Sequence, residues 1–232
     1  KYRRIVLKLS GEVLGNPAAG ECIDPQALVS MARRVSRIAG LGVQIGIVLG
    51  GGNIFRGLKG ESSGVNRTIG DYMGMLATII NAMALQSALQ ALGLKAEVLS
   101  GIPIETVCDK MSRHRINSLL NSGHVVIVAG GTGNPFFTTD SAAALRALEM
   151  KADVILKGTR VDGVYSADPE KDPKAVKYDK LSFDEAIGKN LKVMDLTAFA
   201  LCKENALPII VFNVNEKGIL YDIVVGGQHR GT

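Results

Sequence analysis

The hydrophobic residues of the chain follow two alternating patterns, short apolar runs and longer stretches with helical spacing. Residues 3–11 (RRIVLKLSG) and 43–52 (VQIGIVLGGG) are strand-length apolar runs that end in glycine. Between them, in residues 24–42, apolar side chains recur every three or four positions after an Asp-Pro pair, which predicts a helix with Asp24 as its N-cap. The second run is apolar on both faces, which is typical of a buried parallel strand.

The same alternation continues along the rest of the chain. It predicts strands at residues 3–11, 43–52, 96–100, 124–131, 152–158 and 207–214, and helices at residues 24–42, 68–92, 115–123, 141–151 and 195–206. Such an order predicts an α/β fold, a three-layer α/β/α sandwich with a mostly parallel central sheet. The 232 residues contain no repeat, low-complexity segment or linker, so we expect a single domain over residues 1–232.

The predicted helix at residues 68–92 differs from the others because it is apolar almost all round. A helix with this pattern must be buried on more than one side. Burial in the core of one chain and burial between two subunits explain the pattern equally well.

Four of the predicted strands end in distinctive loops. Ligands of parallel α/β sheets bind beyond the carboxyl ends of the strands. The loops are residues 8–11 (KLSG), 50–56 (GGGNIFR), 130–140 (GGTGNPFFTTD) and 157–168 (KGTRVDGVYSAD). Glycine lets backbone N–H groups approach an anion closely. One such turn is a weak signal, but several on neighbouring strands favour an anion site.

Two lysines, Lys8 and Lys157, lie within or at the end of apolar strands. Either one alone would more often reach the surface or pair with a structural carboxylate. Both at glycine-bearing strand ends favour an anion site. A lysine about 4 Å from a phosphoryl oxygen gains on the order of 4 kcal/mol at an effective dielectric constant of about 20.

Three carboxylates, Asp71, Asp140 and Asp195, fall near the starts of predicted helices. Position alone favours capping or helix-dipole roles for all three, with Asp71 in a spacing that resembles a capping box after Thr68. Three such helix ends at the loop side of one sheet would also form a polar cleft.

Composition and missing motifs narrow the choice. The net charge of +5 comes from Lys and Arg spread along the chain, which fits an anionic small ligand at least as well as nucleic acid. No GxxxxGK[ST] or GxGxxG motif occurs. The three histidines form no visible triad or metal pair, so we expect no protein-built metal site: His114, His124 and His229.

The cysteines and the lack of long apolar runs indicate the cellular compartment in which we expect the protein. Cys22, Cys108 and Cys202 are far apart and form no CxxC, as expected in a reducing cytosol. No run reaches the roughly 18 apolar residues of a membrane span, and no signal peptide opens the sequence. We therefore expect a cytoplasmic protein that binds neither membrane nor nucleic acid.

Six motifs occur in the order found in one known family. They are LKLSGE, GGGNIFRG, GDYMGMLAT, GTGNPFFTTDSAA, LKGTRVDGVYSADP and KVMDLTAFALC. Over nearly its whole length the chain resembles the bacterial uridylate (UMP) kinases of the amino-acid kinase superfamily. The resemblance implies the amino-acid kinase fold, transfer of the γ-phosphoryl group of ATP to UMP with Mg²⁺, and a homohexamer built from dimers.

The resemblance also implies roles for individual residues. The chemistry of the residues themselves adds that Lys8, Lys157 and Asp140 would be catalytic, with the lysines flanking the transferred group and Asp140 orienting them. By the resemblance, two further sets of residues would bind the nucleotides. The ATP-binding residues would be Lys8, Leu9, Ser10, Gly11, Gly52, Arg56, Thr159, Tyr165 and Asp168. The UMP-binding residues would be Gly51, Asp71, Thr132, Gly133, Asn134, Pro135, Phe136, Phe137, Thr138 and Thr139. Mg²⁺ would rest mainly on phosphates and water rather than on protein ligands. Of Phe136 and Phe137, we expect at least one to anchor its loop to the core.

One region departs from the family pattern. After GEVLG the chain reads NPAAGECID, and the basic residues expected near Gln86 and Gln90 for an allosteric GTP site are missing. The effect of GTP is therefore left open, while inhibition by UTP at the acceptor site fits the resemblance. Three alternatives remain: a kinase of a small acid such as acetylglutamate or carbamate, a nucleotide sensor without turnover, and a nucleic-acid binder suggested by the basic pI.

Overall fold

The structure is a computed structural model that describes residues 2–55, 64–191, 193–226 and 231–232. Its centre is a seven-stranded sheet in the order β4-β3-β5-β2-β1-β6-β9, in which every neighbouring pair is parallel. The strands are β1 (Arg4–Leu9), β2 (Gln44–Leu49), β3 (Ala96–Ser100), β4 (Asp109–Lys110), β5 (Val125–Ala129), β6 (Val154–Thr159) and β9 (Ile209–Asn213). The predicted α/β class with a mostly parallel central sheet is confirmed.

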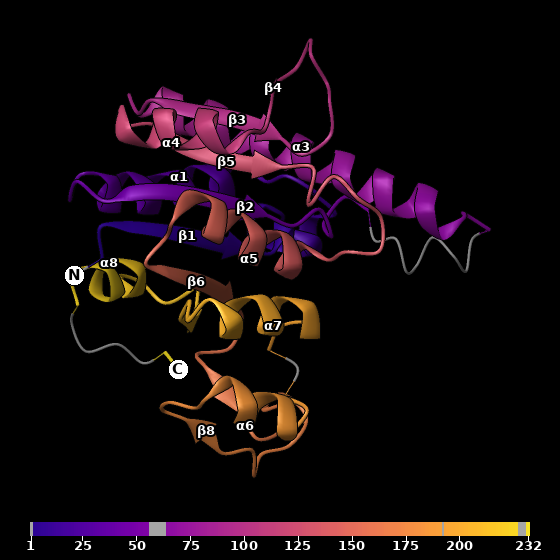
Figure 1. Cartoon of the computed structure of the whole chain (residues 1–232), viewed down its shortest axis with the longest axis vertical. Coiled ribbons are helices and arrows are strands. Elements are labelled where there is room, and N and C mark those ends of the chain that lie inside the picture. Colours follow the sequence, from indigo (N-terminus) through magenta and orange to yellow (C-terminus); the bar gives the residue numbers. More distant parts are fainter. Residues whose placement is uncertain (1, 56–63, 192, 227–230) are drawn as a thin grey trace.

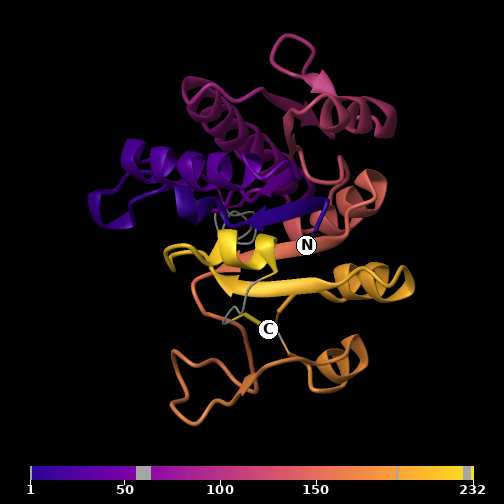
Figure 2. The same ribbon diagram turned by 90° about the vertical axis from the view of Figure 1, so that its left-hand side faces the viewer.

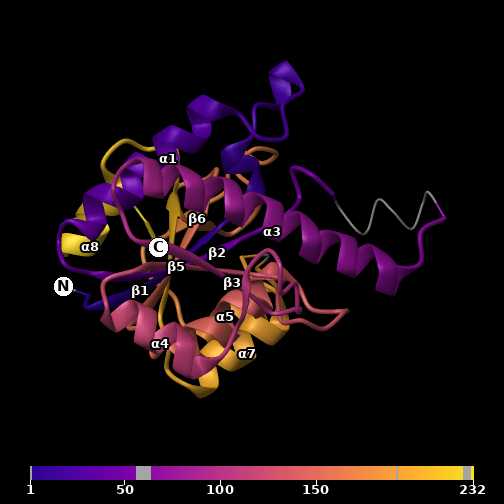
Figure 3. The same cartoon turned by 90° about the horizontal axis from the view of Figure 1, so that it is seen from above.

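Helices cover both faces of the sheet and make three layers (Figure 3). One face carries α1 (Pro25–Ala39), α3 (Arg67–Ala91) and α8 (Ile219–Val225), and the other carries α4 (Arg113–Asn121), α5 (Thr139–Met150) and α7 (Leu196–Glu204). Each face has its own cluster of buried apolar side chains, because alternate residues of each strand point to opposite sides.

Helix α1 shows how the sequence pattern becomes structure. The Asp24 carboxylate accepts a hydrogen bond of 2.9 Å from the backbone N–H of Gln26, and Pro25 occupies the first turn. Met31, Val35 and Ile38 face the sheet and are buried. The predicted helix and its N-cap are therefore confirmed.

Helix α3 is the longest element, and part of it projects beyond the sheet (Figure 1). Its inner face is buried. Its outer face exposes a stripe of large apolar side chains: Ile69, Tyr72, Met73, Leu76, Ile80 and Met83. By length and composition alone α3 could cross a membrane, and it is the one such helix in the described part of the chain. Close to half of it is buried against the rest of the fold, as in the core helix of a folded protein.

The four strands whose loops stood out in the sequence are neighbours, β5-β2-β1-β6, at the centre of the sheet. Because they are parallel, their carboxyl ends and the loops that follow lie at the same edge. Lys8 of β1 is paired in register with Lys157 of β6. The predicted convergence of glycine-rich turns is thus a consequence of the strand order.

A small lobe beneath β6 and β9 was not predicted (Figures 1 and 2). It contains the antiparallel hairpin β7 (Val164–Tyr165) and β8 (Lys177–Tyr178) and the short helix α6 (Phe183–Gly188). Two short 3₁₀ helices, η1 (Gly11–Leu14) and η2 (Pro17–Ala19), also follow β1. These elements are two to six residues long, too short to produce a periodic pattern of apolar residues.

Candidate active site

The centre of the site is a carboxylate held between two lysines. Lys8 Nζ lies 2.6 Å from Asp140 Oδ1, and Lys157 Nζ lies 2.9 Å from Asp140 Oδ2. Lys157 Nζ also donates a hydrogen bond to the carbonyl oxygen of Val193. All three charged side chains are largely buried, with exposed fractions of 12%, 11% and 17% for Lys8, Lys157 and Asp140. These three side chains therefore bring two positive charges and one negative charge into contact at the carboxyl edge of the sheet.

Burial acts in opposite directions on the pKa values of Asp140 and Lys157. For Asp140, burial alone would raise the pKa, but the charges of Lys8 and Lys157 outweigh it and hold the pKa below its usual value of 3.8. For Lys157, burial and the neighbouring charge of Lys8 lower the pKa, and Asp140 offsets only part of that. Asp140 is thus ionised at neutral pH, and Lys157 loses its proton more readily than an ordinary lysine.

The three aspartates do not all behave as caps. Asp195 is the N-cap of α7 and accepts a 2.7 Å hydrogen bond from the N–H of Ala198. Asp140 is not a cap, because Thr138 caps α5 and the Asp140 carboxylate turns toward the lysines. The capping-box interpretation of Asp71 is wrong, because Asn66 caps α3 and accepts a hydrogen bond from Thr68.

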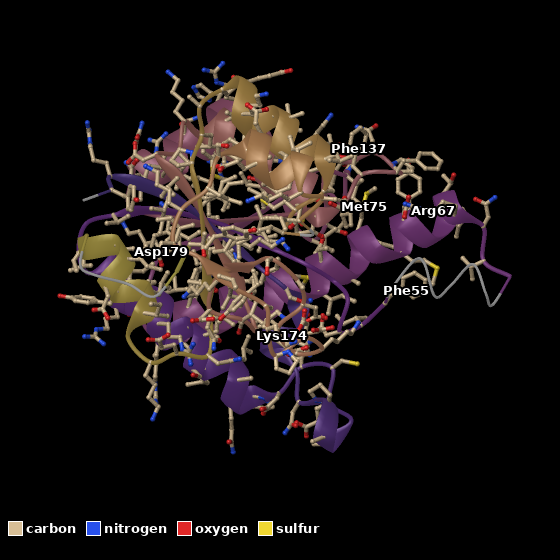
Figure 4. All side chains as sticks on the ribbon, turned by 90° about the horizontal axis from the view of Figure 1, so that it is seen from below. Phe55, Arg67, Met75, Phe137, Lys174 and Asp179 are labelled. Atoms are coloured by element: carbon tan, nitrogen blue, oxygen red, sulfur yellow. The ribbon has the colours of Figure 1, made fainter. Side chains whose placement is uncertain are left out.

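Asp71 instead binds the 130–139 loop, the segment between β5 and α5. Its Oδ2 accepts a 2.7 Å hydrogen bond from the N–H of Phe136, and Arg67 Nε lies 3.0 Å from both carboxylate oxygens. The Arg67 guanidinium lies 5.7 Å from the centre of the Phe136 ring. Figure 4 shows Arg67 and Phe137 on the same side of α3.

Asp195 holds the same loop two residues further along, where it leads into α5. Its carboxylate accepts hydrogen bonds from Ser141 Oγ, at 2.9 and 3.0 Å, and from Thr138 Oγ1. The 130–139 loop is therefore tied to α3 through Asp71 and to α7 through Asp195. Of the three aspartates, Asp140 lies between the two lysines, Asp195 lies beside Lys157, and Asp71 contacts the loop at Phe136.

The backbone of the 130–139 loop needs left-handed conformations. Gly130, Gly131 and Gly133 all have positive φ, and a Cβ on Gly133 would lie 2.6 Å from the carbonyl oxygen of Gly101. Phe136 also has a positive φ of 71°, which is unfavourable for a residue with a side chain. Phe136 as a whole is 68% exposed, and Phe137 is 49% exposed. The expectation that at least one phenylalanine anchors the loop to the core is therefore wrong.

The rest of the predicted acceptor residues belong to this loop or lie beside it. Thr132 Oγ1 donates a 3.2 Å hydrogen bond to the carbonyl oxygen of Asn134, which precedes Pro135, and Thr139 is the first residue of α5. Gly51 follows β2 and packs against α3.

The turns after β1 and β2 are joined to each other. The N–H of Gly50 donates a 2.9 Å hydrogen bond to the carbonyl oxygen of Leu9, and Ser10 caps the short helix η1 that begins at Gly11. Gly52 lies in the turn after β2. Arg56, the predicted partner of ATP phosphates, lies outside the described residues.

A cavity of about 610 Å³ lies on the other side of Lys157, between β6 and the small lobe. It is lined by the predicted donor residues Thr159, Tyr165 and Asp168, and by Asn190, which sequence reasoning missed. A second cavity of about 330 Å³ is lined by Lys157, Asp140 and Asp195 as well as Asn190. The two hollows share Lys157, so a polyanion in the larger one can extend to the lysine pair.

Sequence reasoning missed three further side chains that hold the loops. Thr78 and Asn81 of α3 and Arg146 of α5 are buried polar residues. Arg146 is 2% exposed, donates a 2.9 Å hydrogen bond to the carbonyl oxygen of Gly131 and pairs with Glu149 at 2.8 Å. The available signal was a polar residue on the apolar side of a predicted helix, which is rarely buried without a partner.

Metal-binding side chains are not clustered in the part of the chain that the structure describes. Within it, no three His, Cys, Asp or Glu residues lie close enough to hold an ion. Among the described residues, the carboxylates at the lysine pair are Asp140 and Asp195, and both already accept hydrogen bonds or form ion pairs within the protein.

The parallel sheet, with glycine turns and paired lysines at one edge, defines an α/β protein whose candidate ligand site lies at its strand ends. The chain belongs to the amino acid kinase family, whose sequence profile matches residues 3–213.

Individual relatives match over the whole chain. It is 54% identical over 232 residues to the uridylate kinase of Shewanella amazonensis, covering all of this chain and 95% of that protein. It is also 54% identical over 233 residues to the uridylate kinase of Parabacteroides distasonis, covering all of this chain and 98% of that protein.

Solved structures show the same similarity in three dimensions. The UMP kinase from Ureaplasma parvum superimposes with a TM-score of 0.93 at 39% identity, covering 99% of this chain and 97% of that one. The uridylate kinase from Archaeoglobus fulgidus gives a TM-score of 0.73 at 32% identity, covering 97% of each chain.

Proposed function

We propose that this protein transfers the γ-phosphoryl group of ATP to UMP. One observation carries the proposal: the Lys8–Asp140–Lys157 group stands between a cavity lined by Thr159, Tyr165 and Asp168 and the 130–139 loop. A donor phosphate chain on one side and an acceptor phosphate on the other would meet at the two lysines. The uridylate kinases among its relatives act on the same substrate by name.

Phosphoryl transfer needs positioning and charge neutralisation more than covalent chemistry. In this proposal Lys8 and Lys157 flank the transferred group and stabilise negative charge as it moves from donor to acceptor. Asp140 holds both ammonium groups in place. It does not act as a general base, because a nucleotide phosphate is already ionised at neutral pH.

In this proposal ATP and UMP would bind to different sets of residues. Residues 8–11, with Gly52 and Arg56 beside them, would hold ATP phosphates, and the 610 Å³ cavity would hold the adenosine. Gly51, Asp71 and residues 132–139 would hold UMP, with Asp71 receiving hydrogen bonds from ribose hydroxyls. Mg²⁺ would be held mainly by ATP phosphates and water, since the Asp140 oxygens each have a lysine partner.

The assembly we propose is a homo-oligomer, a homohexamer as the family resemblance implies. The outer stripe of α3 supports it, with Ile69, Leu76, Ile80 and Met83 exposed by 55%, 45%, 49% and 43%. Ile80→Asp should lower the molar mass measured by light scattering. Val176→Asp, a matched change at an exposed apolar residue of the small lobe, should leave it unchanged.

A coupled assay of ADP release tests the proposed function. Rapid turnover with ATP and UMP, slower turnover with CMP and dUMP, and none with acetylglutamate or carbamate are expected. Turnover of a small acid but not of UMP would overturn the proposal. Adding UTP to the assay tests inhibition at the acceptor site, and adding GTP tests whether GTP changes the rate.

A nucleotide sensor without turnover is distinguished by Lys157→Ala. We expect the turnover number to fall by orders of magnitude while UMP binding, measured by calorimetry, survives. Equal loss of binding and rate would mean that Lys157 is only structural. Binding to duplex DNA is measured as a control, because the basic pI left a nucleic-acid binder open, and we expect no salt-sensitive binding. We also propose that the protein works in the cytoplasm.

A further inference from the structure

Residues 74–81 of α3 lie directly beneath three turns of the site. The turns are residues 8–11, residues 50–53 and the start of the 130–139 loop. A Cβ on Gly51 would lie 2.8 Å from Ala77 Cβ and 2.8 Å from the carbonyl oxygen of Gly74. The turn at 50–53 therefore rests on the helix backbone itself, which only glycine permits at this distance.

Asn81 joins this helix segment to two of the turns. It is fully buried, and its Nδ2 lies 2.8 Å from both the carbonyl oxygen of Gly50 and Asn53 Oδ1. Asn53 returns a 3.0 Å hydrogen bond to Asn81 Oδ1 and donates another of 2.7 Å to the carbonyl oxygen of Cys22. A Cβ on Gly11 would lie 2.1 Å from Asn53 Oδ1 and 2.7 Å from Asn81 Nδ2. The pair of amides thus fixes the spacing of the turns after β1 and β2.

Thr78, one helical turn earlier, holds the third turn. It is 5% exposed, its Oγ1 accepts a 2.8 Å hydrogen bond from the N–H of Gly130, and the hydroxyl donates to the carbonyl oxygen of Met75 at 2.6 Å. Gly130 is the first residue after β5 and has a positive φ of 69°. Its N–H is buried together with Thr78, so losing this acceptor would leave a buried donor unpaired.

We infer that Thr78 and Asn81 are positioning residues. Thr78 fixes the position of the 130–139 loop on the acceptor side, and Asn81 fixes the positions of the turns that would hold the donor phosphates. The inference rests on the proposed function for the identity of the two substrates. Thr78 and Asn81 are three residues apart on one helix, so the turns on the two substrate sides are positioned relative to the same helix segment. Displacements of about 1 Å can cost on the order of 100-fold in rate when two reacting groups must be aligned.

Two substitutions separate the two roles. Thr78→Val keeps the side-chain shape and removes the hydroxyl, and should raise the KM for UMP on the order of tenfold with the KM for ATP within about twofold. Thr78→Ser keeps the hydroxyl and should restore the KM for UMP. Asn81→Leu removes both amide partners, and should lower kcat and raise the KM for ATP on the order of tenfold.

A merely structural role gives a different result. Partial unfolding reduces the amount of active protein, which lowers the apparent kcat and leaves both KM values unchanged. The matched controls are Thr106→Val and Asn215→Leu, the same chemical changes at exposed positions, and both should behave as wild type. Unchanged KM values in folded Thr78→Val and Asn81→Leu, or equal effects on both substrates in each, would overturn the inference.

Hydrogen exchange followed by mass spectrometry gives a readout that needs no turnover. Peptides covering 130–139 should exchange faster in Thr78→Val than in wild type, and faster than in Thr78→Ser, whereas a loop held independently of Thr78 would exchange alike in all three. Wild-type turnover of UMP is measured first. Its absence would contradict the proposed function, and the exchange comparison would still decide whether Thr78 positions the loop.

Discussion

Lys8 and Lys157 stand opposite each other on neighbouring strands and bind the two oxygens of one carboxylate, that of Asp140. Register in a parallel sheet brings the lysines to the same height, where their charges repel. Asp140 reaches them from the first turn of α5, on a different element. The geometry of the site therefore depends on how α5 packs against the sheet as much as on the two strands.

Replacing Asp140 by Asn should impair both folding and catalysis. The substitution leaves two largely buried ammonium groups facing each other without a counter-charge. Breaking a buried ion pair on one side costs about 3 kcal/mol of unfolding free energy. Urea unfolding should show that loss, and kcat should fall on the order of 100-fold because the lysines are no longer held in place. Glu204→Gln, the same chemical change at an exposed carboxylate, should be neutral. Wild-type stability and kcat in Asp140→Asn would contradict this role.

The activity should decline with rising pH earlier than an ordinary lysine would allow. Burial and the charge of Lys8 lower the pKa of Lys157 below 10.5, so its positive charge is lost below that value. The alkaline limb of the kcat/KM profile should begin there. In Asp140→Asn the limb should move to lower pH, because the carboxylate that raised the pKa of Lys157 is gone. An alkaline limb at or above 10.5 in wild type would rule out Lys157 as the group that titrates.

Stability should depend on pH through the same group. Because the folded-state pKa of Asp140 is depressed, its contribution is present above 3.8 and is lost as the pH falls through the folded value. Lys157 acts at the alkaline end: its depressed pKa costs stability at neutral pH, and that cost is relieved as the pH rises toward 10.5. Urea midpoints measured across pH should fall more steeply in acid for wild type than for Asp140→Asn.

Asp71→Asn should weaken the acceptor side alone. The change removes the charge that accepts from the Phe136 N–H and pairs with Arg67. Hydrogen bonds to charged groups are stronger than neutral ones, so the KM for UMP should rise on the order of tenfold while the KM for ATP stays constant. The preference for UMP over dUMP should also shrink, because the proposed partner of the ribose hydroxyls is altered. A matched rise in both KM values would indicate a general loss of structure instead.

The cysteines should report unfolding by their reactivity. Burial raises the pKa of Cys202 to about 12, whereas Cys22 is exposed. The thiolate is the reactive form, so a thiol reagent at pH 8 should label Cys22 quickly and Cys202 only when the protein opens. The rate of Cys202 labelling in increasing urea should follow global unfolding. Rapid labelling of Cys202 in the native protein would contradict its burial.

Strong periodic patterns carried most of the fold prediction. The apolar runs that became β1, β2, β5 and β6 and the spacing in α1 are long enough to decide element type, and the glycine-bearing strand ends predicted the edge where Lys8 and Lys157 lie. The small lobe was missed because strands of two residues and a helix of six leave no period to read.

The site was predictable only where a residue's own position in the sequence carried the signal. Asp140 stood out as a carboxylate near the start of a helix, but its place between the lysines depends on three elements meeting. Thr78, Asn81 and Arg146 are polar residues within apolar helices, and their partners are backbone groups of distant turns. Asp71 shows the converse. Its local spacing suggested a helix cap, but its carboxylate accepts a hydrogen bond from Phe136, 65 residues further along the chain.

The sharing of one carboxylate by two ammonium groups has a practical consequence for binding measurements. Asp140 pairs with both Lys8 and Lys157, and the nearby Asp195 accepts hydrogen bonds from Ser141 and Ala198, so the two lysines can still attract a small oxyanion. Sulfate and inorganic phosphate from ordinary buffers will compete for that place. Affinities for nucleotides measured in such buffers will therefore be weaker than those measured in chloride solutions of equal ionic strength.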